Sequence, residues 1–188
     1  MLGAFRGTHR LGRAITVATC CLLLGVYPGI VTAQILKYDN ENEVLMAGTV
    51  SPTSLQSVLE RLIEKCSAYG DNVRVSGEAA LSNWQTRHSA YLEENRKIRA
   101  LVEQSLRQNP KASEMFHDLL YVQTPVVLDK QYESFAAPID MMKTVPAKAS
   151  ICNSYIQAID EKRFDLKNND PTLAAYLDKR IQARNRAK

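Results

Sequence analysis

The stretch EAALSNWQTRHSAYLEENRKIRALVEQSLRQ, residues 78–108, decides how the chain folds. Its apolar and weakly polar side chains recur every three or four residues, which places them on one face of a helix. The stripe consists of Leu81, Trp84, His88, Tyr91, Asn95, Ile98, Val102 and Leu106. At 1.5 Å per residue, such a helix is roughly 45 Å long. The pattern predicts a long central bundle helix whose opposite, charged face, with Glu93 and Glu94, is solvated.

A shorter helix is expected before the long one. Ser51 and Pro52 form a cap and first-position pair, and Gly70 suits the helix end because glycine adopts positive φ without strain. The apolar residues between them follow helical spacing: Leu55, Val58, Leu59, Leu62, Cys66 and Tyr69. Residues 34–50 show no sustained periodicity, so we expect an extended or mobile lead-in there.

A third helix is expected after the long one. Asn109 and Pro110 repeat the cap-and-proline start. Pro125 is expected to break this helix, because a proline disfavours helical geometry at the residue before it. The helix then resumes over 126–136. The apolar residues before the break are Met115, Phe116, Leu119, Leu120 and Val122.

The remaining third of the chain predicts two more helices. An irregular stretch with Met141 and Met142 lies between Pro138 and Pro146. A fourth apolar stripe follows, and a cap-and-proline pair, Asp170 and Pro171, opens the last helix. The stripe holds Ile151, Cys152, Tyr155, Ile156, Ile159 and Leu166. No segment indicates a strand, so the fold class is all-α: a four- to five-helix bundle with one long central helix, forming a single domain over residues 51–188.

The N-terminus has the three parts of a secretory signal. Three arginines and no acid occur before residue 14, residues 14–33 carry no charge, and small residues at Val31 and Ala33 suit signal peptidase. We therefore expect a cleavable signal peptide over residues 1–33 and export to the periplasm or the exterior. The alternative is an uncleaved anchor, because 20 uncharged residues just suffice to span a bilayer; membrane contact is expected only in that case.

Removal of this segment changes the charge argument. The whole chain has 24 basic and 20 acidic residues, a net charge of +4. Arg6, Arg10 and Arg13 lie in the signal, so residues 34–188 hold 21 basic and 20 acidic residues. A near-neutral chain lacks the clustered basic surface of nucleic-acid binding proteins. We therefore expect no nucleic-acid partner.

Two cysteines remain after the signal, Cys66 and Cys152. An even pair in an exported chain predicts a disulfide. Cys66 falls near the end of the first helix and Cys152 near the start of the fourth stripe, so the bond is expected to join these helices. No CxxC spacing is present to favour a redox motif or a zinc site.

The sequence offers little catalytic chemistry. Glu114 and His117 match the Glu-x-x-His spacing of di-iron bundles, but such sites need the motif twice, and Gln85 stands three residues before His88. There is no Gly-x-Ser-x-Gly elbow and no phosphate-binding glycine loop. We expect no catalytic residues, metal or cofactor, and a protein that is not an enzyme.

Binding is the remaining class of function. Candidate interaction or boundary residues are Trp84, His88 and Tyr91 on the long helix and Met141 and Met142 between the prolines. The leading hypothesis is an exported helical protein that binds another protein, as an accessory, inhibitor or immunity-type module. One alternative is an envelope stress chaperone that uses segments 34–50 and 137–146. A further alternative is an enzyme with a site near His88 or His117.

Overall fold

The computed structural model describes residues 37–187. Within this range the chain is all-helical, with no strand. The elements are α1 (Glu41–Ser67), α2 (Asp71–Leu106), α3 (Pro110–Asp118), a π-helical turn η1 (Leu119–Gln123), α4 (Thr124–Met141), α5 (Val145–Asp160), α6 (Leu166–Asn169) and α7 (Pro171–Arg186). The helical bundle expected from the periodicity is confirmed, and its long helix is α2, which begins seven residues earlier than expected.

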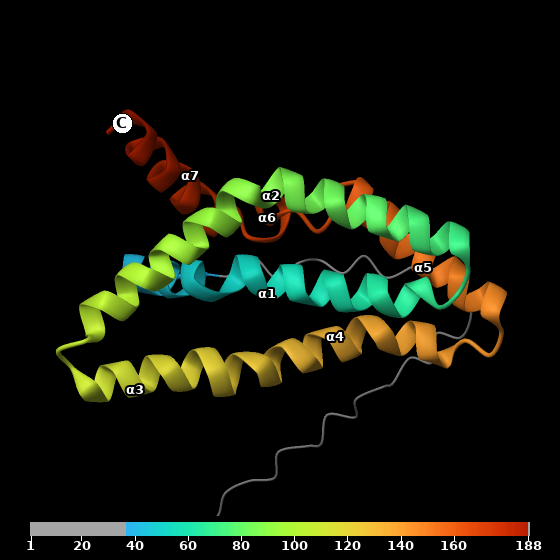
Figure 1. The fold of residues 1–188 in the computed structure, drawn as a ribbon, viewed down its shortest axis with the longest axis horizontal. Coiled ribbons are helices and arrows are strands. Elements are labelled where there is room, and N and C mark those ends of the chain that lie inside the picture. The colour runs from blue at the N-terminus through green and yellow to red at the C-terminus, as the bar shows by residue number, and fades with distance from the viewer. Residues whose placement is uncertain (1–36, 188) are drawn as a thin grey trace, which may run out of the picture. The chain divides into compact units, whose positions relative to one another are not determined.

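The helices pack around α1 (Figure 1). The long helix α2 runs antiparallel to α1 along one side of it. The α3 and α4 helices run along the other side of α1, and α5 packs against α2 and α4. The last helix, α7, contacts the beginning of α1 and the second half of α2. Helices in this arrangement bury one apolar stripe each against their neighbours.

The disulfide between Cys66 and Cys152 is present, as expected, with a Cα–Cα distance of 5.6 Å. It joins α1 to α5 inside the half of the core that also contains Trp84 and Ile139. A second apolar cluster, around Ile98 and the start of α7, fills the other half. The cysteines are fully buried, so the bond is part of the core.

The expectation of an extended or mobile lead-in is wrong for residues 41–50. These residues form the first turns of α1, capped by Asn40, and Gly48 and Thr49 are buried. Pro52 therefore lies inside the helix and does not begin it. An interior proline leaves the carbonyl four residues earlier without its intrahelical donor. Here that carbonyl belongs to Gly48, and it accepts a hydrogen bond of 2.7 Å from the side-chain amide of Asn95.

The break expected at Pro125 is also absent. Thr124 keeps helical dihedral angles, and its N–H bonds the carbonyl oxygen of Leu119, five residues back. The wider π turn lets the chain continue through a proline that has no N–H to donate. The irregular stretch expected after Pro138 is likewise helical as far as Met141, where α4 ends.

The local start signals after the long helix are confirmed. The side chain of Asn109 accepts from the N–H of Ala112, and that of Asp170 accepts from Leu173. The N-cap of α5 is Thr144, which precedes Pro146 by two residues. A cap or an N-terminal proline acts within one helical turn, so these helix starts can be predicted from the local sequence.

The expectation that the charged face of α2 is solvated is wrong for Glu94. Glu94 is only 2% exposed. Its carboxylate forms ion pairs with Arg180 and Arg184 of α7. Both arginines keep about 30% of their side chains exposed, so the pairs fasten α7 to α2 at the edge of the core.

The predicted signal peptide, residues 1–33, lies outside the described residues. Within residues 37–187, no helix combines the length and the apolar character needed to cross a membrane.

Candidate interaction surface

Exposed apolar side chains are concentrated on the segment from α3 to α4. Six of the nine exposed large hydrophobic residues in the described part of the chain belong to it. They are Met115, Tyr121, Val122, Val126, Val127 and Met141. Single exposed hydrophobics are ordinary, whereas a concentration on one element marks an interaction site or an aggregation hazard.

The packing of this segment explains the exposure. Near its start Phe116 and Leu120 are buried, and near its end Ala136 and Ile139 are buried. Over residues 121–127 every residue is exposed except Thr124, which is half-buried. The segment is thus anchored at both ends, and its middle, which includes much of the π turn, faces away from the core.

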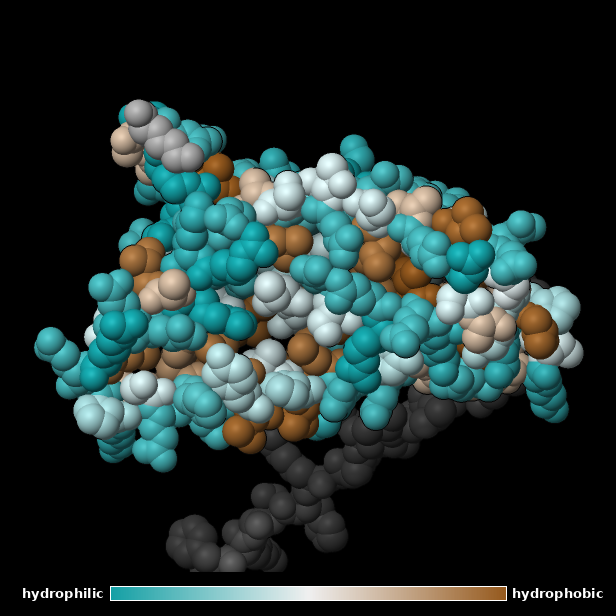
Figure 2. Space-filling model, viewed as in Figure 1, coloured by the Kyte–Doolittle hydropathy of each residue, from teal (hydrophilic) through white to brown (hydrophobic). Residues whose placement is uncertain are grey.

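We call Met115, Val122 and Val126 the outer strip. Their exposed fractions are 65%, 55% and 53%. Met115 and Val122 border the same hollow, and Val126 follows Val122 by about one turn, so the three lie on one side of the α3–η1–α4 segment. Figure 2 shows hydrophobic side chains gathered at the lower edge of the molecule, over the middle of this segment. A π turn at a surface is often associated with function.

A shallow hollow adjoins the outer strip. Met115 and Val122 line it together with polar residues of the same segment. The polar residues are Glu114, His117, Asp118 and Gln123. Gln123 donates a hydrogen bond to the carboxylate of Asp118, and the ring of His117 lies 4.5 Å from that of Tyr121, centroid to centroid. The strip is therefore apolar along its centre and acidic at one end.

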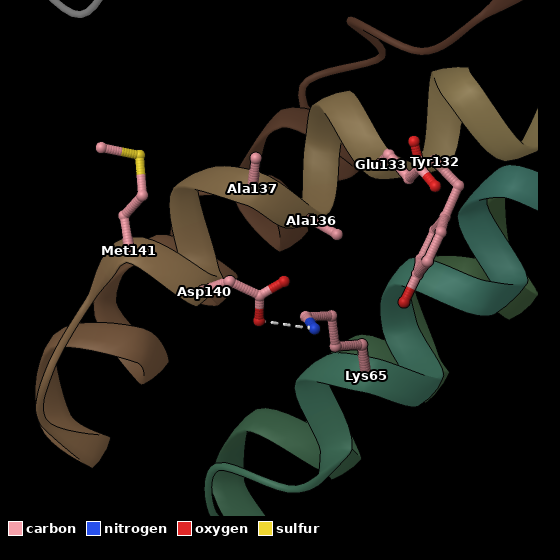
Figure 3. A pocket seen from close by; sticks show the side chains of 7 residues that line it. All are labelled: Lys65, Tyr132, Glu133, Ala136, Ala137, Asp140 and Met141. Carbon is pink, nitrogen blue, oxygen red and sulfur yellow. Dashed lines mark ion pairs between the residues drawn. The ribbon is translucent and has the colours of Figure 1, made fainter.

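A second hollow lies between α1 and α4 (Figure 3). Lys65 of α1 pairs with Asp140 of α4 at 2.7 Å, and this hydrogen bond raises the pKa of the lysine. Met141, which is 76% exposed, borders the hollow and points away from the ion pair. The charges of Lys65 and Asp140 thus neutralise each other where α1 meets α4, and the exposed methionine lies at the rim of the hollow.

The three candidate aromatic residues of α2 lie in the core and not at the surface. Trp84, His88 and Tyr91 are 1%, 4% and 7% exposed. The rings of Trp84 and His88 are stacked with centroids 4.1 Å apart. The indole N–H of Trp84 donates to the carbonyl of Phe164, and the hydroxyl of Tyr91 donates to Asp178. The first hydrogen bond holds α2 against the connection between α5 and α7, and the second holds it against α7 itself.

Both ring nitrogens of His88 are hydrogen-bonded. The backbone N–H of Leu166 donates to Nε2 at 3.1 Å. Nε2 must therefore be an acceptor, so Nδ1 carries the proton and donates to the carbonyl of Trp84 at 2.9 Å. Burial lowers the pKa of this imidazole, opposed by the Trp84 carbonyl and by Asp165. The arrangement fixes a neutral histidine and leaves it no free lone pair for a ligand.

The remaining candidates are separated from one another. Met142 is half-buried at the end of α4, whereas Glu114 and His117 are exposed on α3. No group of three or more potential metal ligands occurs among residues 37–187. Sequence reasoning assigned Met115 and Val122 to an apolar helix face and gave Val126 no role in binding. The signal that could have found the strip is the width of that apolar face, because Phe116 and Leu120 alone fill its core side.

Comparison of the chain with protein-family models, with curated proteins and with solved structures finds no match.

Proposed function

We propose that this protein is an exported, non-enzymatic helical module that acts by protein–protein interaction through the outer strip of the α3–η1–α4 segment. The observation that carries the proposal is the concentration of exposed apolar side chains on one well-anchored helical segment. Exposed apolar patches with polar residues around them mark protein interaction sites. Partner binding would remove the strip from water.

The proposal includes the N-terminal signal and the make-up of the bundle. We propose that residues 1–33 are removed on export, leaving a bundle of α1, α2, the α3–η1–α4 segment, α5 and α7. The disulfide supports an oxidising compartment, where such bonds persist. N-terminal sequencing of the exported protein should give Gln34 as the first residue, and a retained N-terminus would mean an anchor.

The alternative functions have less support. The chaperone hypothesis used residues 34–50 and 137–146 as mobile segments, but residues 41–50 lie in α1 and residues 137–141 lie in α4. The enzyme hypothesis used His88 or His117, and the first of these has both nitrogens engaged. Neither alternative uses the exposed apolar strip.

The test is co-purification from an envelope fraction. The wild-type protein should retain a partner that the variant Val126→Glu loses, because a charge at the centre of an apolar contact is desolvated without a partner. Val75→Glu is the matched control, because Val75 is equally exposed but lies on α2. Equal retention by both variants would show that the strip is not the binding surface.

A further inference from the structure

The charges that flank the outer strip have a two-fold pattern. Asp118 lies four residues before Val122, and Lys130 lies four residues after Val126. Asp118 and Val122 border the same hollow, and Lys130 follows Val126 by about one turn within α4, so each charge lies on the same side of the segment as its valine. An acidic residue, two valines and a basic residue thus follow one another along this side of the segment.

This order makes the face complementary to itself. In an antiparallel helix pair related by a two-fold axis, a residue that meets a second residue is met by that second residue in turn. If Val122 faces Val126 of a second copy, the axis passes beside Thr124. Asp118 then faces Lys130 of that copy, and the same ion pair occurs again on the other side of the axis. A parallel pairing would instead set acid against acid and base against base.

Both charges are available for such a contact. Lys130 is exposed and forms no ion pair with any residue between 37 and 187. Asp118 is half-buried and accepts only from the neutral amide of Gln123 in that part of the chain. Glu114, one turn before Asp118, and Glu133, one turn after Lys130, are both exposed. The pairing is therefore set by Asp118 and Lys130 and not by the net charge of each end.

We infer that the partner bound by the outer strip is a second copy of this chain, in an antiparallel two-fold dimer centred beside Thr124. This inference rests on the strip being a binding surface, as proposed above, and names its occupant. Burial of Val122 and Val126 supplies the apolar centre of the contact. The flanking ion pairs fix its direction and register, as charged pairs do at interfaces.

Sedimentation equilibrium of the purified protein tests the inference. The wild type should dimerise. Lys130→Glu and Asp118→Lys should each weaken dimerisation by about tenfold or more, because each places two pairs of like charges across the axis. An equimolar mixture of these two variants should associate again, since opposite charges then face each other at both positions. Lys179→Glu, an exposed charge reversal on α7, should leave the association unchanged.

The restored association in the mixture excludes misfolding as the cause of the single losses. A wild type that is monomeric at high concentration would overturn the second-copy inference, as would a dimer indifferent to both charge reversals and to Val126→Glu. If the wild type is monomeric and Val126→Glu still loses an envelope partner, the binding surface stands and only its occupant is wrong.

Discussion

The side-chain amide of Asn95 donates a hydrogen bond to the carbonyl oxygen of Gly48, the group that Pro52 leaves without a helical donor. Both groups are buried, and their residues are 47 positions apart. The long helix α2 thus completes the backbone bonding of α1. This explains why α1 continues for 27 residues across an interior proline.

The first prediction follows from this bond. Asn95→Ala should lower the free energy of unfolding by about 1–3 kcal/mol, because it leaves a buried carbonyl without a donor. Urea denaturation measures the change. In a Pro52→Ala background the loss should be smaller, since residue 52 can then donate to Gly48. Asn83→Ala on the exposed face of α2 is the control, and equal losses in both backgrounds would contradict the compensation.

The second prediction concerns Glu94. Replacing Arg180 and Arg184 together with methionine should cost about 3–5 kcal/mol, because a buried carboxylate then has no cation. Glu94→Gln should cost less, since the freed arginines are partly exposed and can be hydrated. Denaturation curves of the two variants give the comparison. A larger loss for Glu94→Gln would mean that the carboxylate is reached by water.

The third prediction concerns pH and His88. Burial holds the pKa of this imidazole below its ordinary value of 6.5, so the unfolded chain binds the proton more tightly than the folded chain. Stability should then be full above about pH 6.5 and decrease as the pH falls below it. Protonation also removes the acceptor at Nε2 for the N–H of Leu166.

The measurement is the free energy of unfolding between pH 7.5 and 5.5. His88→Gln should flatten this dependence, although it lowers stability at pH 7.5 by removing the stacking on Trp84. Arg87 and Asp165 are the charges that act on the imidazole, and they remain in the variant. His117→Gln, which removes an exposed histidine, is the control; if it changes the slope as much as His88→Gln, the assignment to His88 is wrong.

The fourth prediction concerns the disulfide. Replacing Cys66 and Cys152 together with alanine should destabilise the protein by about 4–5 kcal/mol, the chain-entropy value for a loop closed over 86 residues. Urea denaturation measures this loss, and the wild type under reducing conditions should lose the same free energy of unfolding. Two free thiols in the exported protein, found by intact mass, would contradict the bond.

Features that depend on one turn of chain were predictable from the sequence. The caps at Asn109 and Asp170 are local, because the cap and the N–H that it accepts are three residues apart. The pairing of Cys66 with Cys152 needed only an even count and two apolar stripes. The long helix was predictable because its periodicity continues for many turns.

Features that depend on a distant partner were not predictable. Pro52 resembles a helix start until Asn95 is placed beside Gly48. Glu94 resembles a solvated charge until α7 brings two arginines to it. The outer strip was missed for a different reason: the apolar residues of this segment cover a wide arc, so that Phe116 and Leu120 fill the core while Met115 and Val122, at the edge of the arc, stay exposed.

The last prediction separates the outer strip from the core. Val126→Ser should change the free energy of unfolding by less than about 0.5 kcal/mol, because an exposed side chain loses few contacts. Leu120→Ala, six residues earlier but buried, should cost about 2–5 kcal/mol. If Val126 were packed against the core, the two losses would be alike. Denaturation at a protein concentration well below that of dimer formation is needed, since dimerisation adds its own stabilisation of the folded state.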